Sequence, residues 1–563
     1  MFDLVIRGGT VVDGTGAPRR TADVAVSDGV IREVGRITAP ARQTVDADGL
    51  LVTPGFVDIH THYDGQATWD PYLSPSSMHG VTTAVFGNCG VGFAPVRPNS
   101  KDRLIQLMEG VEDIPGTVLS EGVPFDWESF PEYLDALARR SFIMDIGAQM
   151  PHGVLRFYVM GDRGFDHAER PSADETATMA RLLEESLAAG AMGLTTSRTR
   201  KHKASDGTLT PSLSADEPEL HALALAMKRA GRGVFEVNSD FGPGEFEILR
   251  SFCAASGRPM SWLIVQVDKY PNLWRETMEQ IHAARAEGHD VTGQVGCRPI
   301  GMLMGLQTSI NPFTGHSAWE KALRPLHPTK RYAALMADPA LRKALVDGVP
   351  ATEGALGMAR MLERATLLTE PVDLEPDIAN GVSALARRQQ RNPWELALEM
   401  MLSDDGNGLL LYPFENYSAG NSDAIAEMLA DEASVIGVAD GGAHVGLICD
   451  ASAPTYLLSY WARDRRRGRK FDLEYVVRKH TADTARVYGL GDRGVIQPGK
   501  RADLNVIDFD RLMLRKTEVV HDLPAGGSRL LQKARGYRHT FCAGVETVRD
   551  DAYTGALPGR LMR

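Results

Sequence analysis

The chain has 563 residues, more than one compact core normally holds, so a main domain with at least one satellite domain is expected. Hydrophobic residues make up 43% and charged residues 24%, and the net charge of −12 argues against nucleic acid or an anionic membrane surface as the main partner. Five cysteines without a repeated spacing do not form a disulfide framework.

No targeting segment or membrane span is visible in the sequence. The first residues, Met-Phe-Asp-Leu-Val, lack a basic region followed by an apolar stretch. No run reaches the roughly 18 apolar residues that a membrane span needs. With few cysteines, this predicts a cytoplasmic protein that does not contact a membrane. A homo-oligomer is possible.

Both ends of the chain have the pattern of short strands. Residues 2–6 and 22–35 are predicted strands, and Ser27-Asp28-Gly29 predicts a tight hairpin turn. Residues 502–508 alternate between apolar and polar over most of their length, and more short strands follow. We predict that the two ends meet in one small β-sandwich domain.

The middle of the chain alternates strands and helices. Residues 172–190 show a complete helix pattern, with a Ser172–Glu175 capping box, one apolar face and Gly190 as the stop. Predicted buried strands cover residues 80–86, 192–196, 233–237, 262–267, 290–295 and 434–439. Repeated strand–helix units predict an α/β fold of the (β/α)8 TIM-like barrel type. A doubly wound sheet is the alternative, but no glycine-rich dinucleotide turn follows the first strand.

These patterns divide the chain into two predicted domains. Residues 1–53 plus 485–563 form the β-sandwich, and residues 54–484 form the barrel. The segment 297–433 is too long for one crossover, so we predict an inserted lid or subdomain over the site.

That insert contains helical patterns at 339–347 and 393–403. Met302, Met304 and Phe313 near its start offer apolar surface, and we expect them to line a substrate pocket.

The strongest local motif is an apolar strand that ends in His60-Thr61-His62. Residues i and i+2 of a strand point to the same side, so both imidazoles can face one point at the strand's carboxyl end. Barrel enzymes carry out their chemistry there. His60 and His62 are therefore predicted metal ligands. The alternative is two unrelated histidines, because His-x-His also arises by chance.

Two further strands deliver candidate ligands. Cys89 follows a β-branched run in a glycine-rich turn, and a thiolate near two histidines is a good zinc ligand; a buried structural cysteine is the alternative. Asp440 follows the apolar run 434–439 and can hold the metal or accept a proton from metal-activated water. A turn or capping aspartate is the alternative there. Beside His60 and His62, we favour catalysis for Asp440.

Together these motifs resemble the amidohydrolase superfamily and, within it, the N-acyl-D-amino-acid deacylase (D-aminoacylase) family. The resemblance is carried by Leu4 to Gly9, Val12 to Gly14, Pro54 to His62, Gly87 to Gly90, Asp440-Gly441, Asp522 to Gly527 and Thr554 to Leu561. It covers nearly the whole chain and is weakest in 297–433. It implies a barrel with a flanking β-sandwich, amide hydrolysis, His60, His62 and Cys89 as metal ligands, and Asp440 as catalytic base.

The sequence departs from this family in its metal ligands. The family has a histidine at the end of each of the next two ligand-bearing strands, where this chain has Asn238 and Gln266. Neutral amides are poorer zinc ligands than imidazole. The remaining set, His60, His62, Cys89 and Asp440, is sufficient for one metal, so we predict an altered site.

A second departure concerns the substrate. The family follows the aspartate with a His-Pro-Arg segment whose arginine binds the substrate carboxylate, whereas this chain has Ala443-His444-Val445-Gly446. Arg298 is a candidate replacement, because a guanidinium binds carboxylates in bidentate fashion, although a surface arginine is equally plausible. Tyr63, Asn238, Gln266, Arg298 and His444 are the candidate substrate-binding residues.

We therefore predict a metal-dependent amidohydrolase with one divalent metal per chain, zinc. Metal-activated water would cleave the C–N amide bond of an N-acyl amino acid or a related small-molecule amide. One alternative is a cyclic-amide or carbamoyl hydrolase on the same barrel. A non-catalytic binding protein with a degenerate metal site is the alternative from another class, and the loss of two histidines motivates it.

Overall fold

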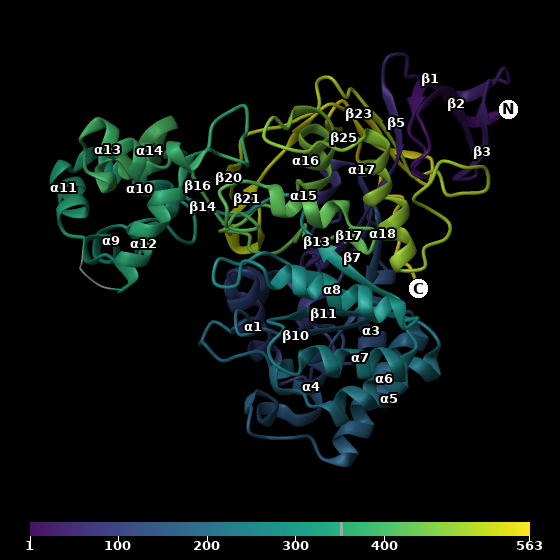
Figure 1. The fold of residues 1–563 in the computed structure, drawn as a ribbon, viewed down its shortest axis with the longest axis horizontal. Helices are drawn as coiled ribbons and strands as arrows, with labels where there is room; N and C mark the ends of the chain where they lie inside the picture. Colours follow the sequence, from purple (N-terminus) through teal and green to yellow (C-terminus); the bar gives the residue numbers. More distant parts are fainter. Residues whose placement is uncertain (350–352) are drawn as a thin grey trace.

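The two ends of the chain meet in one nine-stranded sheet in the computed structural model, which describes residues 1–349 and 353–563 (Figure 1). They join where β5 (Leu51–Pro54) pairs antiparallel with β18 (Leu504–Ile507). The other strands are β1 (Phe2–Val11), β2 (Arg20–Ser27), β3 (Val30–Gly35), β4 (Ala41–Asp46), β23 (Tyr537–Cys542), β24 (Val545–Arg549) and β25 (Ala552–Tyr553). Strand pairing makes this one continuous sheet built from both ends of the chain, and the predicted sandwich arrangement stays a prediction.

Local sequence explains the first hairpin of this sheet. Asp28 and Gly29, between β2 and β3, both have positive φ, at 53° and 71°. Two-residue hairpin loops need this conformation, and Asp-Gly adopts it readily. On the flanking strands, Val24 and Val26 of β2 and Ile31 of β3 are buried in a core shared with the C-terminal strands. The predicted hairpin is therefore confirmed.

Parallel strands form the centre of the molecule. One sheet holds β6 (Phe56–Thr61), β7 (Val81–Phe86) and β8 (Asp145–Ala148). The other follows the order β17-β13-β12-β11-β10-β9 and comprises β9 (Met150–Pro151), β10 (Gly193–Arg198), β11 (Val234–Ser239), β12 (Met260–Ile264), β13 (Val291–Val295) and β17 (Ser434–Ile436). The α/β class that the sequence predicts is confirmed.

The two parallel sheets adjoin at both edges. At one edge, only Gln149 separates β8 from β9. At the other edge, the N–H of His62 donates to the carbonyl of Gly441 at 2.7 Å. The N–H of Asp440 donates to the carbonyl of His60 at 3.1 Å. The segment after β17 is therefore bonded to the end of β6, which carries the two histidines.

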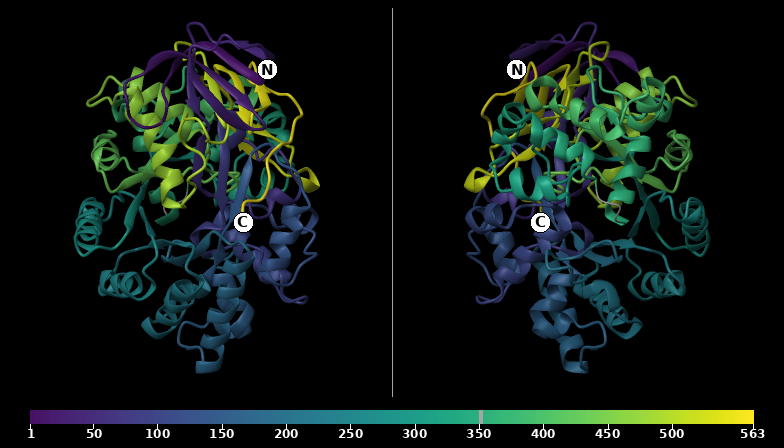
Figure 2. Two further views of the ribbon diagram at one scale, coloured as in Figure 1. Left: turned by 90° about the vertical axis from the view of Figure 1, so that its right-hand side faces the viewer. Right: turned by 90° about the vertical axis from the view of Figure 1, so that its left-hand side faces the viewer.

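Helices on the outside connect these strands (Figure 2). They include α4 (His152–Met160), α5 (Ala173–Ala189), α6 (Glu217–Ala230), α7 (Glu245–Ser256), α8 (Leu273–Ala286), α15 (Asp423–Ala430), α17 (Leu473–Lys479) and α18 (Ala482–Val487). In α5 the capping box of Ser172 and Glu175 is present and Gly190 ends the helix at φ 118°, as predicted. The predicted domain boundary at 484/485 falls inside α18.

Three helices lie between β7 and β8: α1 (Lys101–Glu112), α2 (Gly116–Gly122) and α3 (Phe130–Ala138). The last residue of α1 reaches the candidate site, as described below. No helix among residues 1–349 and 353–563 is long and apolar enough to cross a membrane.

Most of the insert forms a helical lobe that projects to one side of the molecule (Figure 1). It comprises α9 (Ser317–Ala322), α10 (Arg331–Ala337), α11 (Pro339–Asp347), α12 (Glu353–Arg364), α13 (Val382–Gln389) and α14 (Pro393–Gly406), on a small sheet of β14 (Ile300–Met304), β15 (Thr366–Leu367) and β16 (Leu410–Glu415). Met304 and Phe313 are 0% and 1% exposed in the lobe's own core. The expectation that these two residues line a substrate pocket is wrong, because they pack against lobe helices instead.

Candidate active site

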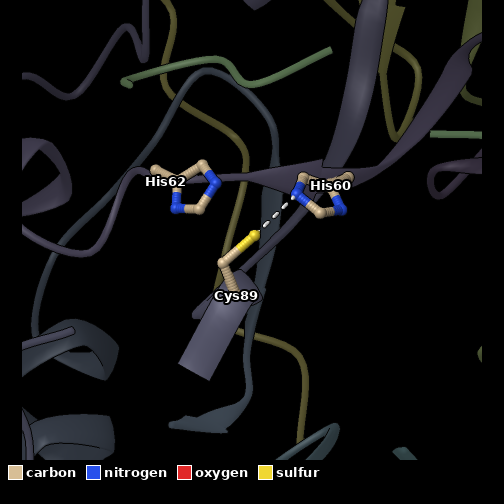
Figure 3. A group of neighbouring side chains, drawn as sticks. All are labelled: His60, His62 and Cys89. Atoms are coloured by element: carbon tan, nitrogen blue, oxygen red, sulfur yellow. Dashed lines mark hydrogen bonds between the residues drawn. The ribbon is translucent and has the colours of Figure 1, made fainter. Parts of the chain in front are cut away.

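Three predicted ligands meet at the carboxyl ends of two neighbouring strands. The ligand atoms of His60, His62 and Cys89 all lie within 4.8 Å of one another, and all three residues are buried (Figure 3). Sγ of Cys89 is 3.5 Å from Nε2 of His60. Because alternate strand residues share a side, β6 presents both imidazoles to the cysteine that follows β7.

Asp440 completes this group from the segment that follows β17 and is bonded to the end of β6. Its Oδ1 lies 3.3 Å from Nε2 of His60 and 3.8 Å from Nε2 of His62. The residue has a positive φ of 49°, and its backbone N–H is bonded to the carbonyl of His60. Burial raises the pKa of the Asp440 carboxyl to about 6. The carboxylate is therefore held against both imidazoles.

Gln294 on β13 orients His60. Its Oε1 lies 2.8 Å from Nδ1 of His60, and an amide oxygen can only accept, so the proton sits on Nδ1. Nε2 then turns its lone pair towards Cys89 and Asp440. Burial lowers the pKa of His60 to about 4, so the imidazole is neutral near pH 7. Neutral imidazole is the form that binds metals.

Glu112, the last residue of α1, lies between two histidines of the site. Its side chain is 1% exposed, with Oε1 3.2 Å from Nδ1 of His62 and Oε2 3.8 Å from Nε2 of His444. Burial raises the pKa of Glu112 well above its usual range, and the nearby charges of Asp440 and Asp64 add to the rise. A bound cation would favour the ionised form of Glu112, and a carboxylate beside Nδ1 would keep the proton on that nitrogen and the lone pair of Nε2 towards the cluster.

The donor set and the charges fit a divalent cation. Among the described residues, no lysine or arginine pairs with Glu112, Glu236 or Asp440, and burial raises the pKa of each. Within the part of the chain that the structure describes, the buried atoms Nδ1 of His62, Oε2 of Glu112 and Oε1 of Glu236 have no hydrogen-bond partner. Two imidazoles and a thiolate are typical zinc ligands, and a dication would offset the buried negative charge.

Two of the five predicted substrate-binding residues lie at the edge of this cluster. Nδ2 of Asn238 is 3.4 Å from Sγ of Cys89. His444 lies beside Glu112, and its side chain is 25% exposed, so it can be reached from solvent. Both residues are therefore placed where they can contact a bound substrate or a ligand side chain.

The structure does not bring the other three to the cluster. Tyr63 is fully buried, and its hydroxyl donates to Oγ of Ser76. The Gln266 side chain bonds the carbonyl of Pro271 and the N–H of Ser418, which ties loops together. The buried Arg298 guanidinium lies 3.2 Å from the Asp450 carboxylate and also donates to Ser452. Each of these three side chains therefore contacts partners away from the cluster.

Four residues that the sequence analysis did not single out border the site: Glu112, His202, Glu236 and Gln294. For Glu236 a signal was present, because it lies two residues before Asn238 on β11 and therefore on the same face as that predicted site residue. Gln294 is one of two polar residues in the short strand β13, which marks it less clearly. Glu112 lies at the end of helix α1, and His202 lies in a loop. Nothing local in the sequence marks their positions.

Replacing Glu112 by glutamine is expected to weaken zinc binding about 10- to 100-fold, the usual effect of losing a carboxylate behind a ligating histidine. The amide keeps the size of the side chain but loses the charge beside His62. Competition with a chelating dye measures the zinc affinity. Glu247→Gln, at an exposed glutamate of α7, is the matched control. Unchanged affinity in Glu112→Gln would show that the carboxylate has no role in positioning His62.

Comparisons with known proteins give one family and one fold. The model of the amidohydrolase family matches residues 43–548. D-aminoacylase of Alcaligenes xylosoxydans xylosoxydans is 37% identical over 197 residues, which cover 35% of this chain and 37% of that protein. N-acyl-D-aspartate deacylase of the same organism is 36% identical over 215 residues, covering 38% of each. The chain thus matches little more than a third of the length of these two relatives.

A longer match and two solved structures extend this comparison. An uncharacterized protein of Mycobacterium tuberculosis is 28% identical over 543 residues, covering 90% of this chain and 84% of that one. A crystal structure of D-aminoacylase covers all of both chains with a TM-score of 0.65 at 23% identity. N-acyl-D-glutamate deacylase of Bordetella bronchiseptica, solved with zinc and a phosphonate inhibitor, covers 100% and 99% with a TM-score of 0.65 at 24% identity. The overall fold is therefore shared with these structures.

Proposed function

Since the chain belongs to the amidohydrolase family and is a hydrolase of carbon–nitrogen bonds other than peptide bonds, we propose that it cleaves the amide bond of an N-acyl amino acid or a related small amide. The observation that carries this proposal is the meeting of His60, His62, Cys89 and Asp440. We also propose that the two parallel sheets close into one (β/α)8 barrel, because they adjoin at both edges.

We propose that one divalent metal per chain, zinc, is held by His60, His62 and Cys89. Zinc bound there would polarise the scissile carbonyl and activate water near neutral pH. The chain offers two nitrogens and one sulfur at mutually short distances. By the family resemblance, Asn238 and Gln266 replace the two further histidines of the family, which removes the imidazoles for a second ion. D-aminoacylase, whose fold is similar, has a binuclear metal centre, so the number of metals is a point at which this chain is proposed to differ.

Asp440 is the proposed proton carrier. Its carboxylate lies beside both imidazoles and is fixed by its backbone hydrogen bond to β6. A carboxylate there can accept the proton that the attacking water loses and then donate it to the leaving nitrogen. His444 is a further histidine whose partly exposed side chain borders this group.

The geometry argues against Arg298 as the group that binds a substrate carboxylate. Its guanidinium is buried against Asp450 and Ser452, and releasing it would leave a buried carboxylate without its partner. The segment Ala443–Gly446 itself contains no arginine. We therefore propose the wider class of N-acyl amino acids and related amides, without restriction to one amino acid.

The test is hydrolysis by the purified protein of a panel of N-acetyl and longer N-acyl amino acids of both configurations. Release of the free amine supports the proposal. Dihydropyrimidines and hydantoins belong in the same panel. Turnover of these cyclic amides alone would support the alternative of a cyclic-amide hydrolase on the same barrel. No release of amine from any N-acyl compound by zinc-loaded protein would contradict the proposal.

A further inference from the structure

The turn that carries Cys89 has an unfavourable backbone. Gly87, Cys89 and Gly90 have positive φ values of 84°, 55° and 67°. Glycine adopts this conformation freely, but cysteine does so only at an energetic cost. Cys89 therefore needs contacts that hold it there, and the turn residues Asn88, Cys89 and Gly90 are all buried.

Strand β11 supplies two of these contacts. Oε2 of Glu236 accepts the backbone N–H of Cys89 at 3.0 Å, and Nδ2 of Asn238 lies 3.4 Å from its Sγ. Glu236 and Asn238 are two residues apart, so one face of the strand presents both. One side chain bonds the backbone of the cysteine, and the other bonds its sulfur.

A third residue orients the Asn238 amide. Nε2 of His202 lies 3.4 Å from Nδ2 of Asn238, and Nδ1 of His202 lies 2.9 Å from Oγ of Ser197. Nδ2 carries two hydrogens, enough to donate to both the sulfur and Nε2 of the imidazole. Nδ1 of the imidazole then carries its proton and donates to Ser197. The opposite orientation of the amide would place Oδ1, an acceptor, against a thiolate.

We propose that Glu236, Asn238 and His202 form a cradle that positions the Cys89 thiolate for the metal. This rests on the proposed function, because it assumes that Cys89 is a ligand. Asn238 is the main positioning residue: its N–H stabilises charge on sulfur without adding a second cation. His202 acts through Asn238, and Glu236 acts through the backbone.

The test compares zinc affinity and the thiolate-to-cobalt charge-transfer band of cobalt-loaded protein. Asn238→Asp keeps the shape of the side chain but turns a donor into a repelling acceptor. Asn238→Ala removes the donor. Both are expected to weaken zinc binding about 10- to 100-fold, the usual range for partners of a ligand, with Asn238→Asp the weaker binder. The charge-transfer band should shift or lose intensity in both.

His202 offers a milder second probe. His202→Ala should weaken zinc binding less than Asn238→Ala, and His202→Gln, which keeps an acceptor for the amide, should restore much of the loss. Asn99→Asp and His221→Ala, at exposed positions, are the matched controls. Circular dichroism of each protein shows whether it is folded.

Two outcomes would overturn the inference in different ways. If wild-type protein binds zinc and Cys89→Ser abolishes the charge-transfer band, but Asn238→Asp and Asn238→Ala behave as wild type, the cradle is wrong and the proposed function stands. If wild-type protein binds neither zinc nor cobalt, the proposed function fails, and the inference fails with it.

Discussion

Replacing His60 by alanine is expected to abolish tight metal binding and to lower kcat/KM about 1,000-fold or more, since metal catalysis supplies several kcal/mol and each 1.4 kcal/mol is tenfold. His60 lies at the centre of the site, with Nε2 3.5 Å from Sγ of Cys89 and 3.3 Å from Oδ1 of Asp440. Its loss removes one of the three close donors. Elemental analysis and hydrolysis rates measure the two effects.

His60 is buried and bonded to Gln294, so the alanine variant needs a check on folding. Circular dichroism and the thermal midpoint supply it, and His60→Gln, closer in size, should give the same losses. His221→Ala, at an exposed histidine of α6, should retain both metal and activity. A folded His60→Ala protein with a full complement of zinc and normal turnover would rule out His60 as a ligand.

Asp440→Asn is expected to lower kcat about 100-fold or more, the usual contribution of a general base, while the protein keeps its fold. Asparagine preserves the size of the side chain and the backbone hydrogen bond to His60. It cannot accept the proton from water. Because the three close donors remain, zinc content should change far less than turnover.

Asp174→Asn, at an exposed residue in the first turn of α5, is the control for this substitution. Steady-state kinetics on the best substrate of the panel give kcat and KM separately. Near-normal kcat in Asp440→Asn would mean that the residue is only a turn former at the end of β17. Loss of zinc in proportion to activity would instead make Asp440 chiefly a ligand.

Much of the central group was predictable because each member ends an apolar strand. His60 and His62 share a face by strand periodicity, and Cys89 and Asp440 follow strands that the β-branched pattern predicts. The carboxyl ends of parallel strands gather at one edge, so three separate segments point to one place. The strand pattern in the sequence and the arrangement of strands in the fold agree at this site, so the four central residues could be predicted from the sequence.

The predictions for residues around the central group were weaker, because the positions of these side chains depend on contacts with residues far away in the sequence. Tyr63 follows His62 directly, so it points to the other side, against Ser76. Arg298 is engaged by Asp450, far along the chain, which no local pattern reveals. Glu112 reaches the site only because α1 ends beside His62. Met304 and Phe313 looked like free apolar surface because the lobe core that buries them is built from distant helices.

The most direct test of the central claim is the metal content of wild-type protein purified without chelators. One tightly bound zinc per chain, required for amide hydrolysis and lost in Cys89→Ser, is the predicted result. Two tightly bound ions per chain would contradict the single site built on His60, His62 and Cys89. A protein that hydrolyses its amide substrate at full rate after complete removal of metal would contradict metal dependence itself.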